Sequence, residues 1–149
     1  MDEKGFSLIE AVLTAMVISL LASVALPRLF FQYSTLTLDR ETERLAAALA
    51  VYREESVYAA AQRQEFLDAS EHQVPVFRLE RGGYSIKGRT GSKRHTLPAG
   101  IELSCNRVTV MFYGTGNAEP LTIILRSGTE RRYVIIDLAG RIRVSLTPP

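Results

Sequence analysis

The sequence has few of the residues from which disulfides, metal sites and catalytic centres are built. Cys105 is the only cysteine, so an intramolecular disulfide and a Cys-rich metal site are both excluded. The two histidines, His72 and His95, stand in polar stretches without a nucleophile, a ligand cluster or a carboxylate at a diagnostic spacing. We therefore expect surface histidines, an inert strand cysteine, no cofactor or metal, and a chain that is not an enzyme.

Length and charge set further bounds. At 149 residues the chain can form one modest domain plus an anchor, and it is too short for two full domains. The formal net charge of +2 conceals an uneven distribution. Residues 1–77 carry 6 basic and 11 acidic side chains, a net of −5, whereas residues 78–149 carry 12 basic and 5 acidic side chains, a net of +7. The two halves are thus suited to different partners.

A long apolar run follows a short N-terminal leader. Between Phe6 and Phe31, Glu10 is the only charged residue before Arg28. As a helix, the 21 residues from Phe6 to Leu26 would be about 30 Å long, which matches the hydrocarbon core of a bilayer. The run therefore predicts a single membrane-spanning helix.

A conventional secretory signal peptide is the alternative interpretation of this run. The small residues Ser23, Val24 and Ala25 offer a plausible cleavage spacing. Against it, the leader over residues 1–4 has a net charge of −1, where a signal peptide is positive, and Glu10 interrupts the apolar region. This alternative predicts cleavage near Ala25 and a secreted enzyme or binding domain released from the membrane.

The junction between leader and apolar run carries a recognisable motif. A carboxylate inside a membrane helix costs about 2.5 to 3.5 kcal/mol at the centre, so Glu10 is a functional candidate by default. The segment Lys4-Gly5-Phe6-Ser7-Leu8-Ile9-Glu10 resembles the prepilin cleavage and methylation motif of type IV pilins and type II secretion pseudopilins. The resemblance implies cleavage by a membrane prepilin peptidase after Gly5, N-methylation of Phe6, and a role for Glu10 in subunit assembly. Such a carboxylate could pair with the free amine of a neighbouring subunit, which would compensate its burial.

A second helical pattern continues beyond Pro27. Apolar and small residues repeat at alternating steps of four and three, as one face of an amphipathic helix does. The members of this face are Leu45, Leu49, Tyr52, Ser56, Ala59, Arg63 and Phe66. The polar sides, expected in solvent, carry Asp39, Arg40, Glu41, Glu43, Arg44, Arg53, Glu54 and Glu55. Packing against a sheet is favoured over a coiled coil, because the seam includes small and charged residues.

After Ser70 the sequence consists of short β-type runs separated by turn residues. Seven strands are predicted, at residues 74–79, 84–86, 101–105, 107–113, 121–126, 133–138 and 141–146. Strands that follow one long helix, with no helix between them, indicate an antiparallel α+β fold. The predicted organisation is a leader at 1–5, a transmembrane and assembly helix at 6–31, its amphipathic continuation at 32–70, and an antiparallel β domain at 71–149.

The β region also resembles a narrower group within the pilin family. The segments Leu97-Pro98-Ala99-Gly100-Ile101, Val110-Met111-Phe112 leading to Gly116, and Asp137 to Val144 are similar to the globular domain of H-type pseudopilins, FimT-like minor pilins and the related minor pilin of competence pili. Within this group, the Gly-Arg-x-Arg element matched by Gly140 to Arg143 is implicated in DNA binding. The resemblance thus implies that Arg141 and Arg143 contact DNA.

Other basic residues accompany this element. Strand alternation would place Arg141 and Arg143 on one face, where both could address adjacent phosphates. The further candidates for DNA contact are Arg131 and Arg132 before the last hairpin, and Lys87, Arg89, Lys93 and Arg94 in a predicted mobile loop. Two alternatives stay open: these cations form a solvated surface, or they contact an acidic neighbouring subunit.

Together, these patterns predict a minor pilin or pseudopilin that primes or tips a type IV pilus-like or type II secretion filament, with DNA uptake as one use. Its expected partners are other pilins or pseudopilins, the prepilin peptidase and the cytoplasmic membrane. DNA is a further partner if the basic residues of the β region contact it. The expected location is the cytoplasmic membrane, crossed once with the C-terminal domain outside the cytoplasm, and then a cell-surface or periplasmic filament.

Overall fold

The computed structural model of the chain describes residues 8–65, 75–88 and 91–149; within α1, the side chains of residues 27–31 and 63–65 are not described. Predictions that concern Gly5, Phe6, Phe66, His72 and Arg89 lie outside the described residues, as does the side chain of Arg63. So does the predicted end of the long helix near Ala69.

The described chain confirms the α+β class. One long helix, α1 (Leu8–Glu65), precedes eight antiparallel strands. The chain forms two compact units, Met1–Leu36 and Thr37–Pro149, so α1 contributes to both. The boundaries predicted for the leader, the assembly helix and its continuation stay a prediction.

The first unit is an apolar helical segment. Its residues Leu8–Leu26 have a mean hydropathy of 2.2 and meet the length and composition needed to cross a membrane. None of this span is buried inside the chain. Exposed apolar surface of this extent needs a cover, and a bilayer is one such cover. The segment is therefore compatible with membrane anchoring.

The second unit contains two four-stranded sheets, both antiparallel throughout. The first sheet has the order β3-β2-β1-β5, and its strands are β1 (Val76–Glu80), β2 (Gly83–Gly88), β3 (Gly91–Thr96) and β5 (Thr109–Val110). The second sheet has the order β4-β6-β7-β8, and its strands are β4 (Ile101–Cys105), β6 (Leu121–Ser127), β7 (Glu130–Ile136) and β8 (Ile142–Ser145). The sequence predicted β strands but not their division between two sheets.

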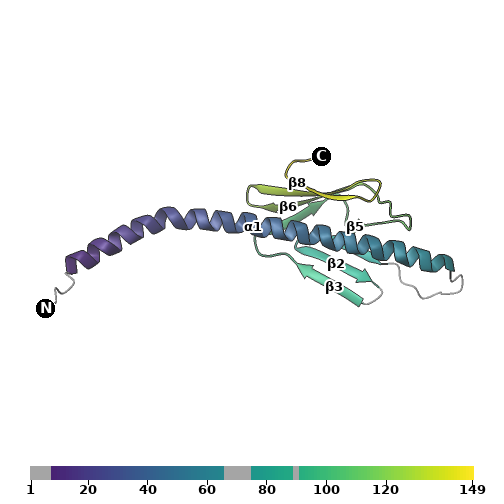
Figure 1. Cartoon of the computed structure of the whole chain (residues 1–149), viewed down its shortest axis with the longest axis horizontal. Coiled ribbons are helices and arrows are strands. Elements are labelled where there is room, and N and C mark those ends of the chain that lie inside the picture. The colour runs from purple at the N-terminus through teal and green to yellow at the C-terminus, as the bar shows by residue number, and fades with distance from the viewer. Residues whose placement is uncertain (1–7, 66–74, 89–90) are drawn as a thin grey trace, which may run out of the picture. The chain divides into compact units, whose positions relative to one another are not determined.

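The C-terminal half of α1 packs on both sheets of this unit (Figure 1). Its buried residues repeat at steps of four and three, which gives one continuous face. They are Leu38, Glu41, Thr42, Leu45, Leu49, Tyr52 and Ser56. The predicted amphipathic seam is thus confirmed from Leu45 to Ser56, and it extends two turns further towards the N-terminus. Residues 28–65 of α1 contain neither glycine nor proline, which agrees with an uninterrupted helix over this range.

Tyr52 connects the helix to the first sheet. Its hydroxyl lies 3.1 Å from the carbonyl oxygens of both Pro75 and Val110. Its ring packs against Phe77 and Phe112, with centroids 5.4 and 5.7 Å away. Burial raises the pKa of the Tyr52 hydroxyl, because the charged form would lose its hydration. The tyrosine is therefore held as a neutral hydrogen-bond donor inside the core.

Two strand predictions were wrong. The cationic segment 87–94 was predicted as a loop, but Lys87 and Gly88 belong to β2 and residues 91–94 belong to β3, and the two strands pair from Gly83↔Thr96 to Gly88↔Gly91. The predicted strand at 107–113 shrinks to β5, and Phe112 forms only an isolated bridge with Ala118. Here the chain turns back early, because Tyr113 N–H donates to the carbonyl of Asn117.

Four residues expected in solvent are instead partly or fully buried: Asp39, Glu41, Arg53 and His95. Glu41 is 8% exposed, although it was assigned to a polar side of the helix. His95 was expected at the surface, but its Nε2 lies 2.6 Å from the Glu41 carboxylate, and its ring packs on Tyr84 at 5.0 Å. The carboxylate is thus buried together with a hydrogen-bond partner, as burial of a charge requires. This pair links α1 to β3.

Candidate functional site

Glu10 lies in the first turn of α1, within the apolar span. Its side chain is exposed, and among the described residues its carboxylate has no hydrogen-bond or ion-pair partner. The Thr14 hydroxyl donates to the Glu10 backbone carbonyl at 2.7 Å and not to the carboxylate. A carboxylate near a helix N-terminus is favourable for the helix dipole, and it is also free to pair with a cation from outside the chain.

The Gly-Arg-x-Arg element runs from the tight turn before β8, which contains Gly140 and Arg141, into the first residues of that strand. The Asp137 carboxylate accepts hydrogen bonds from the backbone N–H of Arg141 at 2.9 Å and from its Nε at 2.7 Å. These bonds, led by the one from the backbone, lower the pKa of Asp137. Arg141 is therefore already ion-paired within the chain, although its side chain remains 80% exposed.

Arg143 differs from Arg141 in its surroundings. It lies in β8 opposite Ile135 of β7, on the face of the second sheet that points away from α1. Its side chain is exposed and has no carboxylate partner among the described residues. Ile142, one residue earlier, packs against the core, as strand alternation requires. The two arginines of the element are thus not equivalent.

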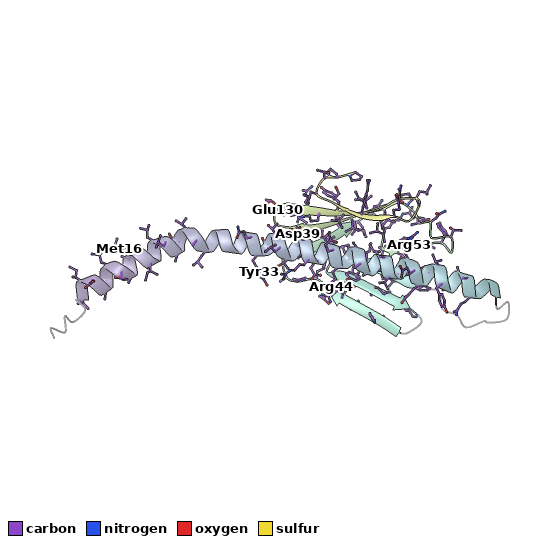
Figure 2. All side chains as sticks on the ribbon, viewed as in Figure 1. Met16, Tyr33, Asp39, Arg44, Arg53 and Glu130 are labelled. Carbon is purple, nitrogen blue, oxygen red and sulfur yellow. The ribbon has the colours of Figure 1, made fainter. Side chains whose placement is uncertain are left out.

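Arg131 and Arg132 lie on opposite faces of β7, inside the strand that they were predicted to precede. Arg132 is 8% exposed and bonds Asp39 of α1 at 2.6 Å and Glu130 at 3.1 Å. Figure 2 labels both carboxylate residues where α1 meets the second sheet. Burial disfavours the charge of Arg132, but the hydrogen bonds with Asp39 and Glu130 outweigh burial and raise its pKa. Arg132 therefore joins the helix to the sheet, and it is not available to a ligand.

The candidates for DNA contact on β2 and β3 also differ in whether they have a carboxylate partner. Arg94 is ion-paired with Glu80 at 3.0 Å. Lys87 and Lys93 are exposed, and no carboxylate among the described residues contacts them. The cations proposed from the sequence are therefore brought to two different sheets, and three of them, Arg94, Arg132 and Arg141, are ion-paired inside the chain.

A groove with a volume of about 680 Å³ lies on the second unit and was not predicted. Four arginines line it: Arg81 after β1, Arg107 after β4, Arg126 of β6 and Arg131 of β7. Three of the four received no assignment from the sequence, because they come from separate elements and form no contiguous run. Only the sheet register brings them together.

No cluster of three or more His, Cys, Asp or Glu side chains that could hold a metal ion occurs in the part of the chain that the structure describes. Cys105 lies at the end of β4 as expected, and burial raises the pKa of its thiol.

Comparisons of the chain with protein families, with curated proteins and with solved structures gave no match.

Proposed function

We propose that the chain is a minor pilin or pseudopilin, which the prepilin peptidase cleaves after Gly5 and methylates at Phe6. It then assembles into a type IV pilus-like or type II secretion filament, as the subunit that primes or tips it. One observation carries the proposal: in the sequence, a glycine, a hydrophobic residue and a glutamate at fixed spacing lead into an apolar helical span that is not buried inside the chain, and that helix continues into an α+β unit.

The apolar span is suited to two environments, the lipid bilayer and the interior of a filament. Its side chains are unburied in the single chain, so they need lipid before assembly and neighbouring helices afterwards. The Glu10 carboxylate is unpaired among the described residues, so a methylated amine at Phe6 of a neighbouring subunit is a suitable partner during that transfer. The second unit would then lie outside the cytoplasm, first at the membrane and later in a surface or periplasmic filament.

The test is the intact mass and N-terminal sequence of the chain recovered from membranes of a cell with its own processing machinery. We expect a start at Phe6 with one added methyl group. The Gly5→Val variant should keep its leader, because a side chain there blocks close approach of the protease to the backbone. Glu10→Gln should be processed like wild type but absent from filaments. A start near Leu26 would establish the signal-peptide alternative and exclude the filament role.

A second candidate function is DNA binding at the filament tip. Arg143 favours it, since it is exposed on the second sheet and has no carboxylate partner among the described residues. Affinity for duplex DNA should fall with salt, and each lost phosphate contact should flatten the slope of log affinity against log salt by about one. Arg143→Ala should weaken binding more than Arg141→Ala, because Asp137 already pairs with Arg141. A purely structural subunit would show neither effect.

A further inference from the structure

The arginine groove lies on the outer face of the second sheet, defined as the face opposite the buried residues Ile123 and Leu125 of β6. Glu102 and Ser104 of β4, Ile124 and Arg126 of β6, and Arg131 of β7 form its floor, since these residues alternate with the buried ones. The walls come from Leu79 to Arg81 and from Asn106 to Val108. The groove is therefore built from both sheets.

The connection between the walls and the floor is made by the backbone. Leu103 N–H of β4 donates to the carbonyl of Arg81 at 3.0 Å, and Leu79 N–H donates to the carbonyl of Val108 at 2.6 Å. These bonds fix the β1–β2 turn and the segment after β4 beside the second sheet. The arginines at positions 81 and 107 are consequently held at the rim by hydrogen-bonded backbone.

The charges of this groove are not balanced within the described chain. Arg126 bonds Glu102 at 3.0 Å, and Arg107 is ion-paired with Glu119. Glu80, the other lining carboxylate, is 3.0 Å from Arg94, which lies outside the groove. Among the described residues, no carboxylate contacts Arg81 or Arg131. Two guanidinium groups thus remain for an external anion.

Strand register adds a reason for an anion to bind. Arg126 and Arg131 are direct cross-strand partners in the β6–β7 pair. Like charges directly opposite each other are destabilising. Only Arg126 has a carboxylate partner, Glu102, and Arg131 has none among the described residues. An anionic group bound at Arg131 would relieve this repulsion and could use the bidentate geometry of guanidinium.

The rest of the lining indicates what else the ligand contains. Val108 and Ile124 give the groove an apolar part, and Val108 is 60% exposed. No aromatic side chain lines it, so bases would find no ring on which to stack. Glu80 and Glu102 would also repel the closely spaced phosphates of a nucleic acid, whereas a peptide can alternate carboxylates with apolar residues.

From these contacts we infer that the groove binds an acidic, partly apolar peptide segment of a partner protein, with Arg81 and Arg131 as its carboxylate ligands. This binding site is independent of the filament role, and it uses none of the residues of the Gly-Arg-x-Arg element.

Fluorescence anisotropy tests the inference on the full chain in non-ionic detergent. The probe is a short, labelled peptide of alternating glutamate and leucine, capped at both ends, and a glutamine-for-glutamate peptide serves as its control. Arg81→Gln and Arg131→Gln should each weaken binding of the glutamate peptide about tenfold, the loss expected for one charge-assisted contact. Lys93→Gln and Arg143→Gln remove the same charge from exposed positions outside the groove, and they should leave the affinity unchanged.

Three results would overturn the inference. Equal binding of the glutamate and glutamine peptides would exclude carboxylate recognition. Equal losses of peptide affinity in the groove variants and the control variants would show that binding depends only on the net charge of the chain. Tighter binding of single-stranded oligothymidine, lost in Arg81→Gln and Arg131→Gln, would assign the groove to nucleic acid. Circular dichroism of each variant distinguishes loss of a ligand contact from loss of the fold.

Discussion

Replacing Gly140 by alanine should destabilise the second unit far more than the same change at Gly128. Both glycines have positive φ, +71° and +58°, so alanine at either position costs about 1 kcal/mol of backbone strain. A Cβ at Gly128 would meet nothing within 4 Å. A Cβ at Gly140 would collide with the carbonyl oxygen of Gly116 and lie 3.1 Å from Arg53 Nε, which itself donates to that carbonyl at 3.1 Å.

The additional cost at Gly140 comes from moving backbone. Gly116 cannot shift without breaking its bond to Arg53, which joins α1 to the turn between β5 and β6. Overpacking of this kind costs about 1 to 3 kcal/mol, so Gly140→Ala should lower the free energy of unfolding by about 2 to 4 kcal/mol, against about 1 kcal/mol for Gly128→Ala.

Urea unfolding of the full chain in detergent, followed by near-ultraviolet circular dichroism, measures both values. The chain has no tryptophan, and five of its six tyrosines belong to the second unit, so the signal reports on that unit. Equal destabilisation by Gly140→Ala and Gly128→Ala would refute the reasoning, because it would leave only the φ penalty. It would also mean that the Gly-Arg-x-Arg glycine has no packing role.

The remaining predictions concern the buried tyrosines. Tyr52→Phe leaves two carbonyls without their shared donor and should cost about 1 to 2 kcal/mol in the same unfolding assay, whereas Tyr58→Phe on the exposed side of α1 should cost less than about 0.5 kcal/mol. If the two variants match, the Tyr52 hydroxyl does not hold helix and sheet together. Burial raises the pKa of Tyr52 and Tyr84 above 10.0, so their neutral forms stabilise the fold below pH 10, and this contribution is lost as pH rises through their folded values. Unfolding free energy should therefore fall above about pH 10, less steeply in the Tyr52→Phe/Tyr84→Phe double variant, and a fall of equal steepness in both proteins would contradict this.

The helix and most strands could be predicted because their patterns are local. The seam from Leu45 to Ser56 repeats with the helical period, and β4 and β6 alternate between buried and exposed residues. Such periodicities are properties of short windows, so one sequence is sufficient to detect them. The same windows do not record which strand lies beside which, and the division into two sheets could not be predicted from them.

The failures occur where tertiary contacts override local composition. β3 has the sequence GSKRHT, which contains glycine, two cations and no aliphatic residue, so its composition favours a loop. Its strand conformation comes from pairing with β2 and from contacts with distant residues: Arg94 with Glu80, and His95 with Glu41. Glu41 was assigned to solvent for the same reason, because its partner is 54 residues away.

The basic half of the chain shows why a charge count is a poor guide to a binding surface. Arg132 was a candidate for DNA contact because it stands beside Arg131, yet strand alternation sends one side chain into an ion pair with α1 and the other into the groove. Arg141 was grouped with Arg143, yet Asp137 holds it within the turn. What a partner can recognise is the subset of exposed cations that have no carboxylate partner among the described residues. This subset includes Arg131 and Arg143 on the outer face of the second sheet, Arg81 after β1, Lys87 of β2 and Lys93 of β3. A variant that removes Arg131 alone should therefore change acidic-peptide binding more than one that removes both Arg132 and Arg141, although the latter lowers the net charge twice as much.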